Sequence, residues 1–231
     1  MRLLHIIATP RDQGSNTLRI SRAFVESLRD KHDDLRVEVL DLFNYDLPSV
    51  AGNIIEAKYH LVRGLKIDPD HEQSWKEIET LIEYFLRADV YLITSPMWNF
   101  SIPYALKYYI DCIVQPGYLF RYNEQGQAVG MTIGKSMVCI TSRGGDYSEL
   151  SPFHNFDFQE PYLRAIFGLC GITNMHFVNA QPMDITPEIR ETAVKAAIAE
   201  AQALATNLDW LPVQDAPEVE NLKGLKPAVF T

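Results

Sequence analysis

Residues 90–113 read VYLITSPMWNFSIPYALKYYIDCI, an apolar run followed by a break and then a helical repeat. The run at 90–95 is short and apolar, as in a buried strand, and Pro96 ends it. Pro103 fits the first turn of a following helix, where a missing N–H costs little. Apolar residues then recur at helical spacing: Ile102, Leu106, Tyr109, Ile110 and Ile113. The stretch predicts a strand, a loop and a helix.

The same alternation extends in both directions along the chain. Ser74 fits the N-cap of the next helix upstream, with Glu77 as its capping-box partner. Residues 43–73 are irregular and polar, and they carry no periodic pattern. Apolar runs and helical spacing predict strands at 3–8, 36–40, 137–142 and 175–178, and helices at 18–28, 75–85, 162–170 and 187–207.

Five strands that alternate with helices predict an α/β fold, a doubly wound parallel sheet with helices on both faces. No repeat or linker divides the chain, so we expect one domain over 1–207 and an extended tail over 208–231. In such sheets, ligands bind beyond the carboxyl ends of the strands, where the strand order reverses. That rule singles out three loops, those after the strands at 3–8, 90–95 and 137–142.

The composition is that of an acidic globular protein. The chain has 231 residues, of which 47% are hydrophobic and 22% charged, and its formal net charge is −9. Such a chain repels phosphate backbones and anionic lipid, so neither nucleic acid nor a membrane surface is an expected partner. No apolar stretch approaches the ~20 residues that span a bilayer, and no leader-like segment stands at the start. We expect a soluble, cytoplasmic protein.

The three cysteines are Cys112, Cys139 and Cys170. Their odd number, wide spacing and apolar neighbours do not indicate a disulfide framework. There is no CxxC pair and no paired-histidine spacing. The sequence therefore predicts buried free thiols and no metal site.

The first of the three loops, at residues 9–17, is rich in small polar side chains. Free N–H groups and the helix dipole at a helix N-terminus face an anion, and hydroxyl groups bind its remaining oxygens. The loop lacks GxGxxG and a Walker lysine, which disfavours a dinucleotide or a nucleoside triphosphate. It predicts a phosphate monoester site; the alternative is a simple N-capped loop. The candidate residues are Thr9, Gly14, Ser15, Asn16 and Thr17.

The second loop follows the strand at 90–95 and carries Pro96, Met97, Trp98, Asn99 and Phe100. Apolar and aromatic side chains at a strand end suit a planar hydrophobic ligand, whose edge an amide or a loop N–H could reach. The alternative is a core plug between helices.

The third loop carries Ser142, Arg143, Gly144 and Gly145. Paired glycines let the backbone approach a ligand and present two N–H donors. Paired glycines also mark any tight turn. The functional interpretation gains weight because all three loops lie at one edge of the predicted sheet.

Together these loops resemble those of the FMN-dependent NAD(P)H azoreductases and quinone reductases of the flavodoxin-like fold. The resemblance extends through residues 106–111, 120–122 with Gly126, and 171–173, and it spans about 1–207. It implies a sheet in the order 2-1-3-4-5. The phosphate loop, with Pro10 and Arg11, departs from the family pattern.

The resemblance also implies a tightly bound FMN and a homodimer with a site at the subunit interface. Ser15, Asn16 and Thr17 would hold the phosphate. Met97, Trp98, Asn99 and Phe100 would border the flavin ring, and Gly144 and Gly145 would contact its pyrimidine end. The other cofactor-binding residues would be Thr9, Gly14, Pro96, Ser142 and Arg143. Phe120 of the neighbouring subunit and Trp98 would form the substrate pocket.

The chemistry implied is hydride transfer from NADH or NADPH through flavin N5 to a quinone or azo compound, by a ping-pong mechanism. Backbone donors at Gly144 and Gly145 would stabilise negative charge on the reduced ring. The protein itself needs no nucleophile.

Two other functions share the fold, the cofactor and the acidic charge: a flavodoxin-like electron carrier and a free-flavin reductase. The long excursion at 43–73 and the aromatic segment at 118–122 are large for a minimal carrier. In a loop, that aromatic segment would leave apolar surface exposed, which favours a homodimer. The alternative is that the loop folds back on its own core.

Overall fold

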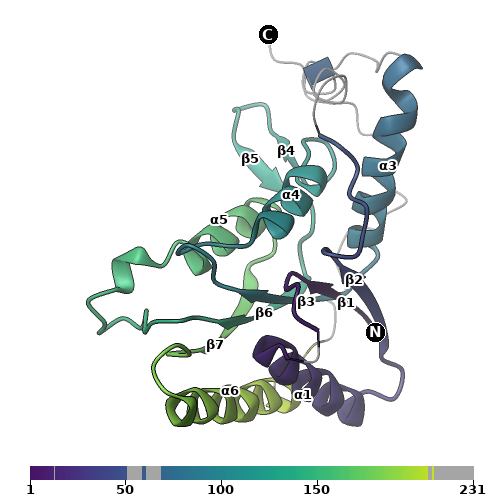
Figure 1. The fold of residues 1–231 in the computed structure, drawn as a ribbon. Helices are drawn as coiled ribbons and strands as arrows, with labels where there is room; N and C mark the ends of the chain where they lie inside the picture. The colour runs from purple at the N-terminus through teal and green to yellow at the C-terminus, as the bar shows by residue number, and fades with distance from the viewer. Residues whose placement is uncertain (13, 51–58, 61–68, 208–209, 211–231) are drawn as a thin grey trace.

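Five parallel strands form the central sheet of the computed structural model (Figure 1). The structure describes residues 1–12, 14–50, 59–60, 69–207 and 210. The strand order is β2-β1-β3-β6-β7. This is the predicted order 2-1-3-4-5, because β4 (Phe120–Tyr122) and β5 (Ala128–Gly130) pair with each other outside this sheet. The sheet strands are β1 (Arg2–Ile7), β2 (Arg36–Asp41), β3 (Val90–Pro96), β6 (Ser136–Ser142) and β7 (Asn174–Ala180). Each coincides with a predicted strand to within one or two residues at either end.

Helices cover both faces of the sheet, as predicted. The helices α1 (Asn16–Lys31) and α6 (Pro187–Asn207) lie side by side below it in Figure 1. The opposite face carries α3 (Pro69–Leu86), α4 (Tyr104–Ile113) and α5 (Glu160–Leu169). Successive strand residues point to opposite faces.

Two hydrophobic cores result from this alternation. In β1, Leu3 packs in the core with α1 and α6, while Leu4 packs in the core with α3, α4 and α5. Both leucines are almost fully buried, at 0% and 1% exposure. A strand covered on both faces loses the apolar–polar alternation, which is why β1, β3 and β6 are nearly continuous apolar runs.

Two helix starts differ from the prediction. The helix α3 begins at Pro69, so Ser74 lies inside it and the predicted N-cap there is wrong. Because proline is tolerated in the first turn of a helix, α3 can begin at Pro69, upstream of the N-cap predicted at Ser74. Pro103 occupies the N-cap of α4 rather than its first turn.

The stretch predicted to be irregular, 43–73, is only partly described. It is irregular at 43–50 and helical at 59–60 and from Pro69 onward. Residues 51–58 and 61–68 lie outside the described residues.

The aromatic segment at 118–122 is not an exposed loop. Its end forms β4 (Phe120–Tyr122), which pairs antiparallel with β5 (Ala128–Gly130). Leu119 is fully buried and Phe120 is 8% exposed within their own chain. Strands of three residues are too short to show a period in the sequence, so this hairpin was missed. The exposed surface that favoured a homodimer is therefore absent at Leu119 and Phe120.

The hairpin meets the body of the domain through two glycines. A Cβ at Gly130 would lie 2.2 Å from the backbone nitrogen of Gly171. Gly171 itself has φ +100°, a conformation that L side chains rarely adopt. Next to them, Thr132 donates from both its backbone N–H and its hydroxyl to the carbonyl of Cys170. The two backbones therefore touch directly.

Trp210 belongs to the packed domain although it lies beyond the expected boundary at 207. It is 1% exposed and packs edge-on against Phe24 of α1, with ring centroids 5.7 Å apart. Its indole N–H donates to the carbonyl of Ala205. The rest of 208–231 lies outside the described residues.

All three cysteines are buried free thiols, as predicted. Burial raises the pKa of Cys112 and of Cys170 to about 12. Within the described residues, no group of His, Cys, Asp and Glu side chains could hold a metal ion. No helix in that part of the chain has the length and apolarity to cross a membrane.

Candidate functional site

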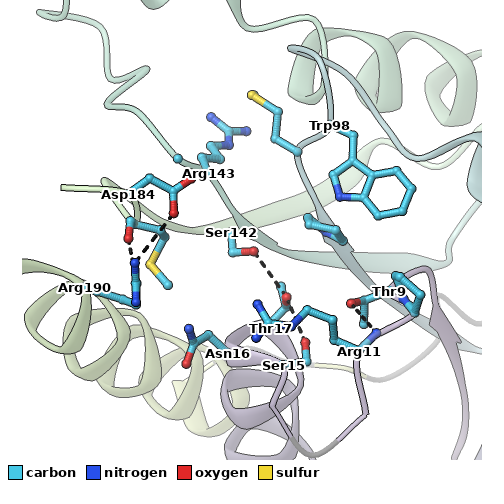
Figure 2. A pocket seen from close by; sticks show the side chains of 15 residues that line it. Thr9, Arg11, Ser15, Asn16, Thr17, Trp98, Ser142, Arg143, Asp184 and Arg190 are labelled. Carbon is cyan, nitrogen blue, oxygen red and sulfur yellow. Dashed lines mark hydrogen bonds and ion pairs between the residues drawn. The ribbon is translucent and has the colours of Figure 1, made fainter. Parts of the chain in front are cut away.

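A cavity of about 390 Å³ opens at the carboxyl ends of β1, β3 and β6 (Figure 2). This is the edge of the sheet that the strand order singles out for ligand binding. The cavity is lined by Thr9, Pro10, Arg11, Ser15, Asn16, Thr17, Pro96, Met97, Trp98, Ser142, Arg143, Gly144, Met183, Asp184 and Arg190. The three predicted loops therefore meet in one place.

The floor of the cavity is the N-terminus of α1. Ser15 caps the helix, accepting a hydrogen bond from the backbone N–H of Leu18 at 3.3 Å. The hydroxyl of Thr17 lies 3.3 Å from that of Ser15 and 3.3 Å from that of Ser142. Thr17 and Ser15 are nearly buried, at 2% and 3% exposure. Three hydroxyls thus converge where the helix dipole is positive, which suits an anion.

Two arginines stand on opposite sides of this hydroxyl cluster (Figure 2). Arg190 of α6 donates from Nε to the carbonyl of Met183 at 2.7 Å, and its Nη2 lies 3.8 Å from Asp184. Among the described residues, Arg11 has no carboxylate partner. The first turn of α1 also contains no acidic residue. The cavity therefore carries excess positive charge within an acidic protein.

The loop after β3 forms a tight turn. The backbones of Trp98 and Ser101 exchange two hydrogen bonds, each of 2.9 Å. Between them, Asn99 and Phe100 have φ angles of 48° and 69°, in the left-handed region. Met97 and Trp98 line the cavity, but Asn99 and Phe100 do not. Asparagine tolerates this backbone conformation better than most residues do.

The loop after β6 contributes its backbone and the Ser142 hydroxyl. The carbonyl of Gly144 accepts hydrogen bonds from the backbone N–H groups of Met183 and Asp184, both at 3.0 Å. A Cβ at Gly144 would lie 2.6 Å from a carboxylate oxygen of Asp184. Gly145 faces Tyr147 and does not line the cavity.

The Arg143 side chain points away from the hydroxyl cluster (Figure 2). It is 1% exposed and forms an ion pair with Asp157 at 2.8 Å. Burial lowers the pKa of this guanidinium, while Asp157 and Glu160 act in the opposite direction. Its side chain is therefore part of the protein interior.

Of the predicted site residues, ten line the cavity and five do not. Those that line it are Thr9, Ser15, Asn16, Thr17, Pro96, Met97, Trp98, Ser142, Arg143 and Gly144. Those that do not are Gly14, Asn99, Phe100, Gly145 and Phe120. Phe120 is 8% exposed within its own chain, where it begins β4.

The sequence analysis missed five lining residues. They are Pro10, Arg11, Met183, Asp184 and Arg190. The loop after β7 ends at the same sheet edge as the other three, so the strand-end rule could have included it. It was passed over because its sequence contains no glycine or hydroxyl cluster.

The fold and the site define a flavodoxin-like α/β protein with a cavity lined by hydroxyl and arginine side chains at the strand-order reversal. A family model described as the flavodoxin-like fold matches residues 1–205, and the chain belongs to this family. Its relatives include FMN-dependent NADH:quinone oxidoreductase 3 of Pseudomonas fluorescens, 36% identical over 209 residues, or 90% of this chain and 97% of that protein. FMN-dependent NADH:quinone oxidoreductase 2 of Pseudomonas syringae pv. tomato is 37% identical over 205 residues, 89% of this chain and 98% of that protein.

Solved structures of azoreductases share this fold. An azoreductase from Bacillus anthracis superposes with a TM-score of 0.81 at 27% identity, over 90% of this chain and 99% of that one. An FMN-dependent NADH-azoreductase from the same species, in complex with FMN, superposes with a TM-score of 0.77 at 26% identity, over 89% and 99% of the two chains.

Proposed function

We propose that this protein is an FMN-dependent oxidoreductase that passes hydride from NADH or NADPH to small planar acceptors, quinones and azo compounds. Bound in this cavity, FMN would supply the hydride-transfer chemistry between the two substrates, in a ping-pong sequence. The observation that carries this proposal is the cavity at the carboxyl ends of β1, β3 and β6, with its hydroxyl cluster on the N-terminus of α1.

The residues present fit an FMN-sized ligand. A cavity of about 390 Å³ lies in the range of ~300–1,000 Å³ typical of small-molecule sites. The donors at its floor are hydroxyls and helix N–H groups, which suit the oxygens of one phosphate. The nearby β3 loop is apolar and aromatic, which suits a planar ring system.

The hydroxyls of Ser15 and Thr17 would bind the phosphate, together with backbone N–H groups at Asn16 and Thr17. Arg11 would neutralise part of its charge. Thr9 is buried beside them, and its hydroxyl accepts a hydrogen bond from the Arg11 backbone at 3.4 Å. The resulting floor favours a dianion over a neutral group.

Met97 and Trp98 would border the ring, and backbone N–H groups near Gly144 would face its edge. Trp98 is held in place by an edge-on contact with Phe43, with ring centroids 5.9 Å apart. The only carboxylate that lines the cavity, in the part of the chain described, is Asp184, and no His, Cys or Lys lines it. This lining supports a mechanism without a protein nucleophile, in which solvent supplies the proton to the product.

Purified protein tests the proposal directly. We expect about one FMN per chain, identified by chromatography after denaturation. We also expect oxidation of NADH or NADPH that depends on an added quinone or azo dye, with parallel double-reciprocal plots. A protein that holds FMN but shows no turnover would be an electron carrier, and one that turns over only with added FMN would be a free-flavin reductase.

We further propose that the protein is a cytoplasmic homodimer. Phe100, Phe153, Phe156 and Phe158 are between 44% and 56% exposed, and Leu150 is 99% exposed. Clustered apolar surface of this kind is rare on monomers and is typical of interfaces. Light scattering after gel filtration should give twice the chain mass of 26.3 kDa. A single-chain mass at micromolar concentration would contradict the dimer but leave the proposed chemistry intact.

A further inference from the structure

Arg143 lies on the loop that bounds the cavity, yet its side chain is in the interior. It is 1% exposed, and its guanidinium points away from Ser15 and Thr17 (Figure 2). A buried charge costs free energy unless its partners replace the lost water. The partners therefore show what the side chain holds together.

These partners lie at the two ends of one long loop. Nε of Arg143 donates to the hydroxyl of Thr141 at 3.1 Å, and Thr141 lies near the carboxyl end of strand β6. Nη1 donates to Oδ2 of Asp157 at 2.8 Å, and Nη2 lies 3.6 Å from Glu160, at the start of α5. The guanidinium thus closes the excursion between β6 and α5.

Asp157 transmits this constraint to the first turn of α5. Its second oxygen, Oδ1, accepts hydrogen bonds from the backbone N–H groups of Gln159 at 2.9 Å and Glu160 at 3.1 Å. Those N–H groups have no partner within the helix, so the carboxylate fixes the helix start. One carboxylate therefore links the Arg143 side chain to the start of α5.

The residues just before this helix also hold the opposite wall of the cavity. Gln159 is fully buried and donates from Nε2 to the carbonyl of Pro96 at 2.9 Å. The backbone N–H of Phe158 donates to the carbonyl of Phe100 at 2.9 Å. Residues 157–159 are thereby bonded to both ends of the 96–100 loop and to Arg143.

We propose that Arg143 is a positioning residue that fixes the distance between the two loops on either side of the ring. Through Asp157 and Gln159, it keeps the loop at residues 96–100 at a fixed distance from the loop at residues 142–145. This inference rests on the proposed function, because it assigns the space between those loops to the flavin ring. Its predicted effect is on cofactor affinity and ring environment rather than on the chemistry itself.

The test compares Arg143→Met with Arg164→Met in the full chain, stripped of flavin and titrated with FMN. Arg164 also pairs with Glu160, at 2.7 Å, but its side chain is 47% exposed and it contacts neither loop. We expect Arg143→Met to raise the Kd for FMN at least tenfold and to change the visible circular dichroism of bound FMN. Arg164→Met should stay within twofold of the wild type in Kd.

A double variant separates positioning from simple stability. Arg143→Met alone leaves Asp157 buried without its cation, so the protein loses stability. Arg143→Met combined with Asp157→Asn removes both charges, keeps an Oδ1 acceptor for the N–H groups of Gln159 and Glu160, and should recover part of the melting temperature while FMN binding stays weak. The double variant also carries the test if Arg143→Met does not fold. Recovery of FMN affinity together with the melting temperature would overturn the proposal.

Different results would overturn the positioning role of Arg143 and the proposed function. Tight FMN binding by the wild type with unchanged affinity in folded Arg143→Met protein would overturn the positioning role alone. Failure of the wild type to bind FMN would overturn the proposed function, and this inference with it.

Discussion

Thr17 is the residue at which two loops of the cavity meet. Its hydroxyl lies 3.3 Å from the hydroxyls of Ser15 and of Ser142, which belong to segments far apart in the chain. The side chain is 2% exposed, so its hydroxyl can be satisfied only by these neighbours or by a ligand. This makes it a sharp probe of the phosphate site.

We expect Thr17→Val to weaken FMN binding about fivefold to tenfold, the cost of roughly one hydrogen bond of ~1 kcal/mol. Riboflavin, which lacks the phosphate, should bind the variant as it binds the wild type. Ser21→Ala is the matched control, because Ser21 is buried on the same helix but does not line the cavity. Its hydroxyl donates to the backbone carbonyl of Leu18 at 3.2 Å. Fluorescence titration measures both ligands. Equal losses for FMN and riboflavin would contradict the assignment of the phosphate.

His5 is a buried neutral histidine in β1. It is 7% exposed, and its Nε2 lies 2.8 Å from the Thr94 hydroxyl. Burial lowers its pKa to about 4, from the ordinary value of 6.5, and no charged group contributes. Between pH 6.5 and 4 the unfolded chain therefore binds a proton that the folded chain does not. Folding stability contributed by this group is present above pH 6.5 and is lost as the pH falls toward 4.

His5→Gln should remove this pH dependence while it keeps a hydrogen-bonding side chain. Between pH 7 and pH 5, the wild type should lose about 2 kcal/mol more unfolding free energy than the variant. Urea denaturation at the two pH values measures the difference. Parallel losses in both proteins would show that His5 is already protonated in the fold.

At the scale of elements, the turn at 98–101 shows what a local motif can and cannot predict. The sequence indicated that a loop follows β3 and that Met97 and Trp98 face a ligand. It did not show that Asn99 and Phe100 adopt left-handed backbone angles, because that depends on the pairing of Trp98 with Ser101. An asparagine in such a loop suits a ligand amide and also suits a positive φ, and the sequence does not separate these two roles.

We expect Asn99→Ala to lower the unfolding free energy by about 1 kcal/mol, because alanine is strained at a φ of 48°. Asn99→Gly should cost less, since glycine adopts this conformation freely. Neither variant should change FMN affinity more than a few-fold, because Asn99 does not line the cavity. Chemical denaturation of the Asn99→Ala and Asn99→Gly variants measures both changes in unfolding free energy. A large loss of FMN affinity in Asn99→Gly would restore the amide as a ligand group.

Long apolar or periodic elements were predictable, and short ones were not. The strands β1, β3 and β6 are buried on both faces, so their apolar runs stand out in the sequence. The pair β4 and β5 has three residues in each strand and packs through backbone contacts, which leave no pattern of side chains. Arg190 and Asp184 were missed for another reason, because the loop after β7 carries no glycine or hydroxyl cluster although it lies at the same edge of the sheet.

At the scale of the whole molecule, Trp210 closes the core between α1 and α6. The family model ends at residue 205, so this side chain lies outside the shared fold yet is 1% exposed. Removing it leaves a large cavity beside Phe24.

We expect Trp210→Ala to lower the unfolding free energy by about 3–5 kcal/mol, the usual cost of such a truncation in a core. FMN affinity should be unchanged, because Trp210 does not line the cavity. Glu26→Ala, at an exposed position on α1, should lie within ~0.5 kcal/mol of the wild type. Thermal and urea unfolding measure both. A Trp210→Ala protein as stable as the wild type would place the indole outside the core in solution.

The contact between Gly130 and Gly171 limits how this molecule can be rebuilt. A β-carbon at residue 130 has no space, and one at residue 171 would lie 3.2 Å from the carbonyl carbon of Gly130 at a φ that L side chains rarely adopt. The hairpin cannot therefore be grafted onto a related scaffold as a free-standing module. The recipient would need a glycine in the turn between its α5 and β7 equivalents, and a saturation library at residue 130 should return glycine alone.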